Sequence, residues 1–141
     1  MLKIRIAQIL LVCFLVSCDQ NCNVLSDSIN EQLKNDEEGQ FTLQNTFDFT
    51  WSKLYIFDSY FTSSEMSEII GHECNCGMAD DPDEQYIFVD DAGVVSCFMM
   101  NCSSLSFSNV RNNGVVLLER HKTYKARTVT TNGRERIIIS H

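Results

Sequence analysis

The chain has 141 residues, of which 19 are acidic and 11 are basic, and its formal net charge at pH 7 is −8. This length suits a single domain, and 44% of hydrophobic residues is enough to form a buried core. Because phosphate backbones repel so acidic a chain, nucleic acid is excluded as an expected partner.

The N-terminal residues have the parts of an export signal in the usual order. Lys3 and Arg5 provide a basic start, and an apolar segment of 11 residues follows over 6–16. A membrane-spanning helix needs roughly 20 apolar residues, so this segment is too short to be a permanent anchor. We therefore expect a signal peptide over residues 1–17 that is removed on export.

The signal ends in Leu15-Val16-Ser17-Cys18, which resembles the lipobox of bacterial lipoproteins. The resemblance implies cleavage between Ser17 and Cys18, lipid on the Cys18 thiol, and a protein that faces the periplasm from a bacterial membrane. Two or more acyl chains hold a protein stably at a bilayer, whereas one chain does so only marginally. Asp19 resembles the signal for retention in the inner membrane of a Gram-negative host. The alternative is an ordinary signal peptide with a coincidental cysteine.

After the lipid site, the polar segment 18–23 is expected to be a tether to a single domain over 24–141. Apolar residues then recur at helical spacing, at Val24, Leu25, Ile29 and Leu33. This spacing predicts a first helix over about 24–36. Apolar and polar residues alternate over 41–49, which favours a strand or an extended segment.

The most aromatic part of the chain is 51–61, within which 54–57 has the composition of a buried strand. Thr62 and Glu65 then have the spacing of a capping box, and Gly71 is placed to end a short helix. The sequence Trp-x-Lys-x-Tyr-Ile-Phe before a threonine-initiated helix resembles a block in small uncharacterised bacterial lipoprotein domains. That resemblance implies no activity and no site residues.

The second half contains three pairs of β-rich segments separated by turn sequences. These pairs are 86–89 with 94–100, 105–111 with 115–119, and 124–130 with 135–139. Asn-Gly in the second and third turns is the strongest short-range signal for a hairpin. We therefore expect an α+β domain with one antiparallel meander of about five or six strands. Two short helices from the first half would cover one face.

Five cysteines remain besides Cys18 and the one in the signal peptide, and in an exported protein they are expected to form disulfides. Cys74 and Cys76 are too close together to bond each other without strain. Bridges that join these two to Cys97 and Cys102 are therefore favoured, in either pairing. Cys22 would then be unpaired or form an intermolecular bond.

His72, Cys74, Cys76 and Met78 alternate with other residues, so an extended segment would place them on one face. Thiolate and thioether ligands favour Cu(I), which makes periplasmic copper binding one alternative function. Disulfide formation competes for the same thiols and is the favoured interpretation, so no cofactor is expected. The acidic segment 80–84 lacks the ligand spacing of a calcium loop and is expected to be a solvated turn.

The sequence gives no signal for catalysis, because no nucleophile turn or glycine-rich phosphate loop is present. His72, His121 and His141 are the only histidines, and none lies in a recognisable catalytic motif. We therefore expect that the protein is not an enzyme.

Charge is divided unevenly along the chain. Residues 18–110 contain two basic and 17 acidic residues, whereas 111–141 contain seven basic and two acidic residues. The favoured interpretation is that the C-terminal strands pair with acidic neighbours within one sheet. The alternative is a basic face that lies against anionic lipid or another acidic surface.

The expected function is that of a membrane-anchored module that binds protein or has a structural role in the envelope. Its acidic surface would attract a basic protein partner. Copper binding and inhibition of a basic envelope hydrolase are the two alternatives.

Overall fold

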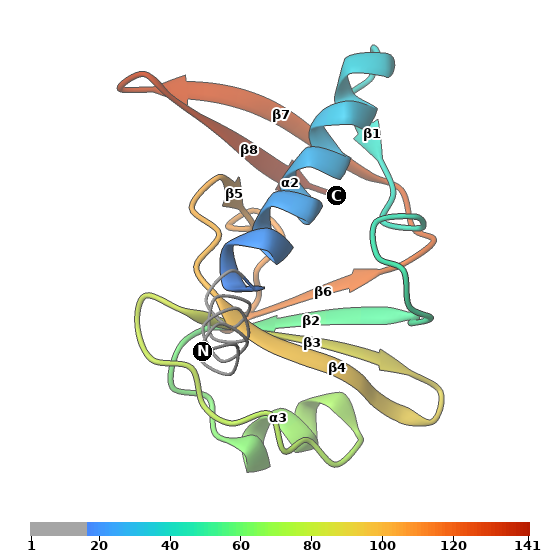
Figure 1. Ribbon diagram of the computed structural model, residues 1–141, viewed down its shortest axis with the longest axis vertical. Coiled ribbons are helices and arrows are strands. Elements are labelled where there is room, and N and C mark those ends of the chain that lie inside the picture. The colour runs from blue at the N-terminus through green and yellow to red at the C-terminus, as the bar shows by residue number, and fades with distance from the viewer. Residues whose placement is uncertain (1–16) are drawn as a thin grey trace, which may run out of the picture.

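The computed structural model describes the backbone of residues 17–141 and the side chains from residue 20 onward. The expected signal peptide therefore lies outside the described residues, as do the side chains of Ser17, Cys18 and Asp19. Within the described part, the chain forms two helices and eight strands (Figure 1). The α+β class expected from the sequence is confirmed.

The strands form two four-stranded sheets rather than one. Sheet I has the order β1 (Gln40–Phe41), β7 (Tyr124–Thr131), β8 (Arg134–Ser140) and β5 (Leu105–Ser106). Sheet II has the order β4 (Gly93–Met100), β3 (Glu84–Asp90), β2 (Lys53–Phe57) and β6 (Val115–Glu119). The expectation of a single meander is therefore wrong.

Two of the three predicted hairpins are confirmed and the middle one is wrong. β3 pairs with β4, and β7 pairs with β8, both antiparallel. β5, however, pairs parallel with β8, and β6 pairs antiparallel with β2. The predicted turn does form, but the bridge between Asn112 and Val115 does not continue into a ladder. Phe107 and Val110 are instead buried in the core, which turns their segment away from β6.

The helix α2 (Ser17–Asn35) begins earlier than predicted, so residues expected to form a tether belong to its first turns. Leu25 and Ile29 are fully buried on its inner face, which explains the helical spacing in the sequence. The chain turns after the helix at Gly39, whose φ is +69°. A Cβ at Gly39 would lie 2.7 Å from the carbonyl oxygen of Ala126, so only glycine fits there.

The helix α3 (Ser63–Ile70) has the predicted ends. Thr62 Oγ1 accepts a hydrogen bond from the Glu65 amide, and the Glu65 carboxylate accepts one from the Thr62 amide at 2.8 Å. The bond from the Thr62 backbone, followed by that from its hydroxyl, lowers the pKa of Glu65. Gly71 adopts the left-handed conformation that ends the helix.

The core is divided into two clusters, one on each face of sheet II. The larger cluster lies between sheet II, sheet I and α2, and includes Leu54, Tyr86 and Tyr124. The smaller one lies between the other face of sheet II and α3, and includes Phe57 and Met66. The helices therefore lie on opposite faces of sheet II, not on one face as expected. Figure 1 shows α3 below sheet II and α2 crossing toward β1.

Candidate functional site

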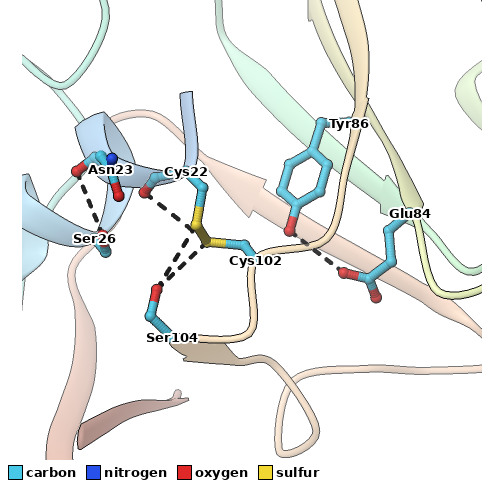
Figure 2. The surroundings of a disulfide bond; sticks show 7 residues. All are labelled: Cys22, Asn23, Ser26, Glu84, Tyr86, Cys102 and Ser104. Atoms are coloured by element: carbon cyan, nitrogen blue, oxygen red, sulfur yellow. Dashed lines mark hydrogen bonds between the residues drawn. A yellow bond between two sulfur atoms is a disulfide. The ribbon is translucent and has the colours of Figure 1, made fainter. Parts of the chain in front are cut away.

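The beginning of α2 is held covalently to the rest of the domain. Cys22 forms a disulfide with Cys102, 80 residues away, with their Cα atoms 5.4 Å apart. The Ser104 hydroxyl lies 3.7 Å from Cys22 Sγ and 3.6 Å from Cys102 Sγ (Figure 2). It must be the donor, because a disulfide sulfur carries no hydrogen. The expectation that Cys22 has no partner in the chain is therefore wrong, and the expected tether begins four residues before a crosslink.

The second disulfide joins Cys76 to Cys97, which is one of the pairings expected from the sequence. Cys97 lies within β4 and Cys102 two residues beyond its end, and the two cysteines reach opposite sides of sheet II. Cys97 faces the smaller core cluster, where Cys76 lies, and Cys102 faces the larger one, where α2 begins. Cys74 is the free cysteine among the described residues, and it is buried.

The structure does not bring the proposed metal ligands together. Cys76 is in a disulfide, Cys74 is 1% exposed in the smaller core cluster, and Met78 is 47% exposed. His72 lies beside Gly93, 3.8 Å from the position that a Cβ there would occupy. Across the described residues, no three His, Cys, Asp or Glu side chains form a group that could hold a metal ion.

The feature that stands out on the surface is the outer face of the β7–β8 ribbon. Side chains alternate between the two faces of a strand, and Tyr124, Ala126, Ile137 and Ile139 point into the core. The outward positions on these strands include four exposed cationic residues, namely Lys125, Arg127, Arg134 and Arg136. We call these four residues the cationic face.

In the strand ladders of the described residues, no acidic residue lies opposite any member of the cationic face. Across the β7–β8 ladder, Lys125 is opposite Ser140, Arg127 is opposite Ile138, and Arg134 and Arg136 are opposite Thr131 and Val129, respectively. On the other edge of β7, Lys125 is opposite Gln40. Within residues 20–141, none of the four forms an ion pair with a carboxylate. The favoured interpretation, in which these strands pair with acidic neighbours, is therefore wrong.

The other three cations of the C-terminal segment have partners. Arg111 forms ion pairs with Asp58 and Glu84. The Arg120 guanidinium lies 5.9 Å from the centre of the Trp51 ring, and its Nε donates to the carbonyl of Gln44 at 3.0 Å. The Lys122 ammonium lies 5.5 Å from the centre of the Tyr124 ring. These contacts give the three cations structural roles, in contrast to the cationic face.

Arg111 belongs to a partly buried polar network. The Tyr86 hydroxyl donates to Glu84 at 3.3 Å, and Glu84 also accepts from Arg111 at 2.5 Å. Burial raises the pKa of Tyr86 far above its ordinary value, and the nearby Glu84 carboxylate raises it further. Tyr86 is therefore a neutral hydrogen-bond donor at any physiological pH, and the network is suited to holding β3 against the Asp58 turn.

The inner side of the same ribbon has the opposite charge. Beyond the core, Thr128 and Glu135 line a cavity of about 830 Å³ that separates the ribbon from α2. Asp27, Glu31 and Lys34 of α2 line the same cavity, so its charged lining consists of three carboxylates and one ammonium group. The ribbon therefore presents cations to solvent on one side and borders an acidic cavity on the other.

Comparisons of the chain with protein-family models, with curated proteins and with solved structures gave no match. Between residues 17 and 141, no helix is both long enough and apolar enough to cross a membrane. The sequence analysis gave a basic face of the C-terminal segment only as the alternative and did not identify which residues form it. One signal in the sequence could have identified these residues. Basic residues alternate with other residues on both sides of a predicted hairpin turn, as Lys125-x-Arg127 and Arg134-x-Arg136, and this spacing places them on one face.

Proposed function

We propose that this protein is a lipid-anchored module of the bacterial envelope whose cationic face binds anionic lipid headgroups. The observation that carries the proposal is the set of four exposed cations on one side of a two-stranded ribbon, without carboxylates opposite them. Such a face is electrostatically complementary to the surface of an anionic bilayer.

The number of charges sets the strength of this interaction. A basic residue close to an anionic membrane contributes about 1 kcal/mol, so four contribute about 4 kcal/mol. That corresponds to roughly a thousandfold preference for the anionic surface. This is weak for a protein in solution, but it is enough to orient one that a lipid already holds at the membrane.

The expected anchor supports the same orientation. Lipid on Cys18 would be attached at the beginning of α2, four residues before the disulfide at Cys22. The partner cysteine, Cys102, is two residues from Ser104, whose carbonyl accepts a hydrogen bond from Ile137 of β8 at 2.8 Å. The anchored end is thereby connected to the ribbon by short, fixed segments. The acidic surfaces of α2 and of the ribbon's inner side would be repelled by the same headgroups and would face away.

Vesicle binding tests the proposal directly. A chain with Cys18→Ser, which cannot be lipidated, would be sedimented with phosphatidylcholine vesicles that contain either 30% phosphatidylglycerol or none. We expect binding only to the anionic vesicles, weakened by added salt because screening shortens the range of the attraction. The double substitution R127Q/R134Q should reduce binding at least tenfold.

The matched control is K34Q/K53Q, which removes two exposed lysines outside the cationic face. Equal losses in the two variants would show that net charge, rather than the face, controls binding and would refute the proposal. Failure of the unsubstituted chain to bind anionic vesicles, together with capture of an acidic protein by the same face, would assign the face to a protein partner instead. The basic protein partner expected from the acidic part of the sequence stays a separate prediction.

A further inference from the structure

A second cavity, of about 760 Å³, lies beside the Cys22–Cys102 disulfide. It is bordered by the turn after β2, by the segment before β3, and by the residues around β5. Only Arg136 of its lining belongs to the cationic face, and the lining combines an exposed aromatic ring, carboxylates, two arginines and serine side chains.

The aromatic ring belongs to Tyr60, which at 59% is the most exposed large hydrophobic residue in the described part of the chain. Its φ of +73° is a conformation that bulky residues rarely adopt. The Tyr60 amide donates to the carbonyl of Ala79 at 2.8 Å, which holds the backbone in this conformation. Backbone strain of this kind is concentrated at functional sites. The chain thus keeps a ring at the rim of the cavity although its exposure and its backbone both reduce stability.

Fixed polar groups lie next to the ring. The Arg111 guanidinium is held between Asp58 and Glu84, so all three side chains are positioned before any ligand arrives. The Asp58 side chain remains 46% exposed and keeps lone pairs that can accept from a ligand. Ser103, Ser106 and Ser108 also line the cavity, and the hydroxyls of Ser106 and Ser108 lie within hydrogen-bond distance of each other, at 3.2 Å.

The charges of the cavity select the class of ligand. An anion would face the carboxylates of Asp58, Asp81 and Glu84, and a cation would face the guanidinium groups of Arg111 and Arg136. Neither an anion nor a cation meets a lining of opposite charge alone, whereas a neutral molecule with many hydroxyl groups can form hydrogen bonds with both kinds of polar side chain. A ring with an apolar face can in addition stack on Tyr60.

We propose that this cavity binds neutral sugar rings, with Tyr60 as the stacking surface and Asp58, Arg111 and the serine hydroxyls as hydrogen-bond partners. The site shares Arg136 with the cationic face, and the other three residues of that face do not line the cavity. A protein with both features would hold a glycan close to the membrane.

Titration of the mature chain with three neutral trisaccharides, cellotriose, maltotriose and triacetylchitotriose, tests the proposal. Saturation-transfer NMR detects the contact, and calorimetry measures the affinity. We expect at least one of the three to bind and inorganic phosphate not to compete. Tyr60→Ala should weaken binding about threefold to tenfold, the contribution of an aromatic stacking contact.

The control is Ile69→Ala, which removes a similarly exposed apolar side chain from α3 and should leave sugar binding unchanged. Tyr60→Gly, which accepts the positive φ without strain, provides a second variant should the alanine variant unfold. No binding of any trisaccharide at 10 mM, or binding unaffected by either Tyr60 variant, would overturn the proposal. Vesicle binding should be unchanged by Tyr60→Ala, and sugar binding by R127Q/R134Q, so the two proposals can fail separately.

Discussion

Removal of the Cys22–Cys102 disulfide should destabilise the protein more than removal of Cys76–Cys97. The first bond closes a sequence separation of 80 residues and the second closes 21. Because the second loop lies inside the first, the effective length of the outer loop is about 60 residues. The chain-entropy relation then gives about 4.3 kcal/mol for the outer bond and about 3.3 kcal/mol for the inner one at 25 °C.

Packing adds to this difference, because Cys102 is 5% exposed in the larger core cluster. Its replacement by alanine also leaves a small cavity. The assay is urea unfolding of C22A/C102A, of C76A/C97A and of the unsubstituted chain, each followed by the fluorescence of Trp51. Trp51 is the only tryptophan in the sequence and is 2% exposed, so its emission reports unfolding of the larger core cluster.

We expect the free energy of unfolding to fall more in C22A/C102A than in C76A/C97A, by at least 1 kcal/mol. Hydrogen exchange should in addition show lost protection at the beginning of α2 in C22A/C102A only, because the bond from Cys22 to Cys102 holds that end of the helix. An equal or larger loss in C76A/C97A, or intact protection of α2 in C22A/C102A, would refute the reasoning.

Three further predictions concern single residues. Because the pKa of Tyr86 is raised in the folded chain, this tyrosine ionises first in the unfolded chain as the pH rises. The free energy of unfolding should therefore fall above pH 10, by about 1.4 kcal/mol per pH unit for this group. Tyr86→Phe should reduce that slope in urea unfolding at pH 9–11. Gly39→Ala should cost about 2–4 kcal/mol and lower the melting temperature more than Gly133→Ala, since both glycines have positive φ but only Gly39 has a backbone atom in the way of a Cβ. Equal melting temperatures of the two variants would contradict the close approach of Gly39 to β7. Intact-mass measurement of the chain extracted from membranes should show cleavage before Cys18 and added acyl mass. An unmodified Cys18 would contradict the proposed lipid anchor.

Local signals explain which parts of the fold were predicted. The ends of α3 follow from contacts within a few residues, between Thr62 and Glu65 and at Gly71, so the sequence contains all the relevant information. The β3–β4 and β7–β8 hairpins are likewise closed by their own turns. β5 pairs parallel with β8, and β6 pairs with β2. These pairings depend on which core cluster each segment packs against, and the residues close by in the sequence do not determine that.

The sequence predicted only part of the candidate site. The basic character of the C-terminal segment was evident, but its interpretation depended on which strands lie beside β7 and β8. A single meander would have placed the segment 115–119 beside β7, whereas in the structure the neighbours of β7 are β1 and β8. The disulfides show the same limit, since the partner of Cys102 comes from the other end of the chain.

The central claim, that the cationic face lies against an anionic membrane, can be tested by the depth of attached fluorophores. The lipidated chain would carry a label at Thr131→Cys on the ribbon or at Glu68→Cys on α3, because both positions are exposed and the free Cys74 is buried. In anionic vesicles that contain a headgroup-linked quencher, we expect strong quenching at position 131 and little at position 68. Equal quenching at the two positions, or stronger quenching on α3, would contradict the account.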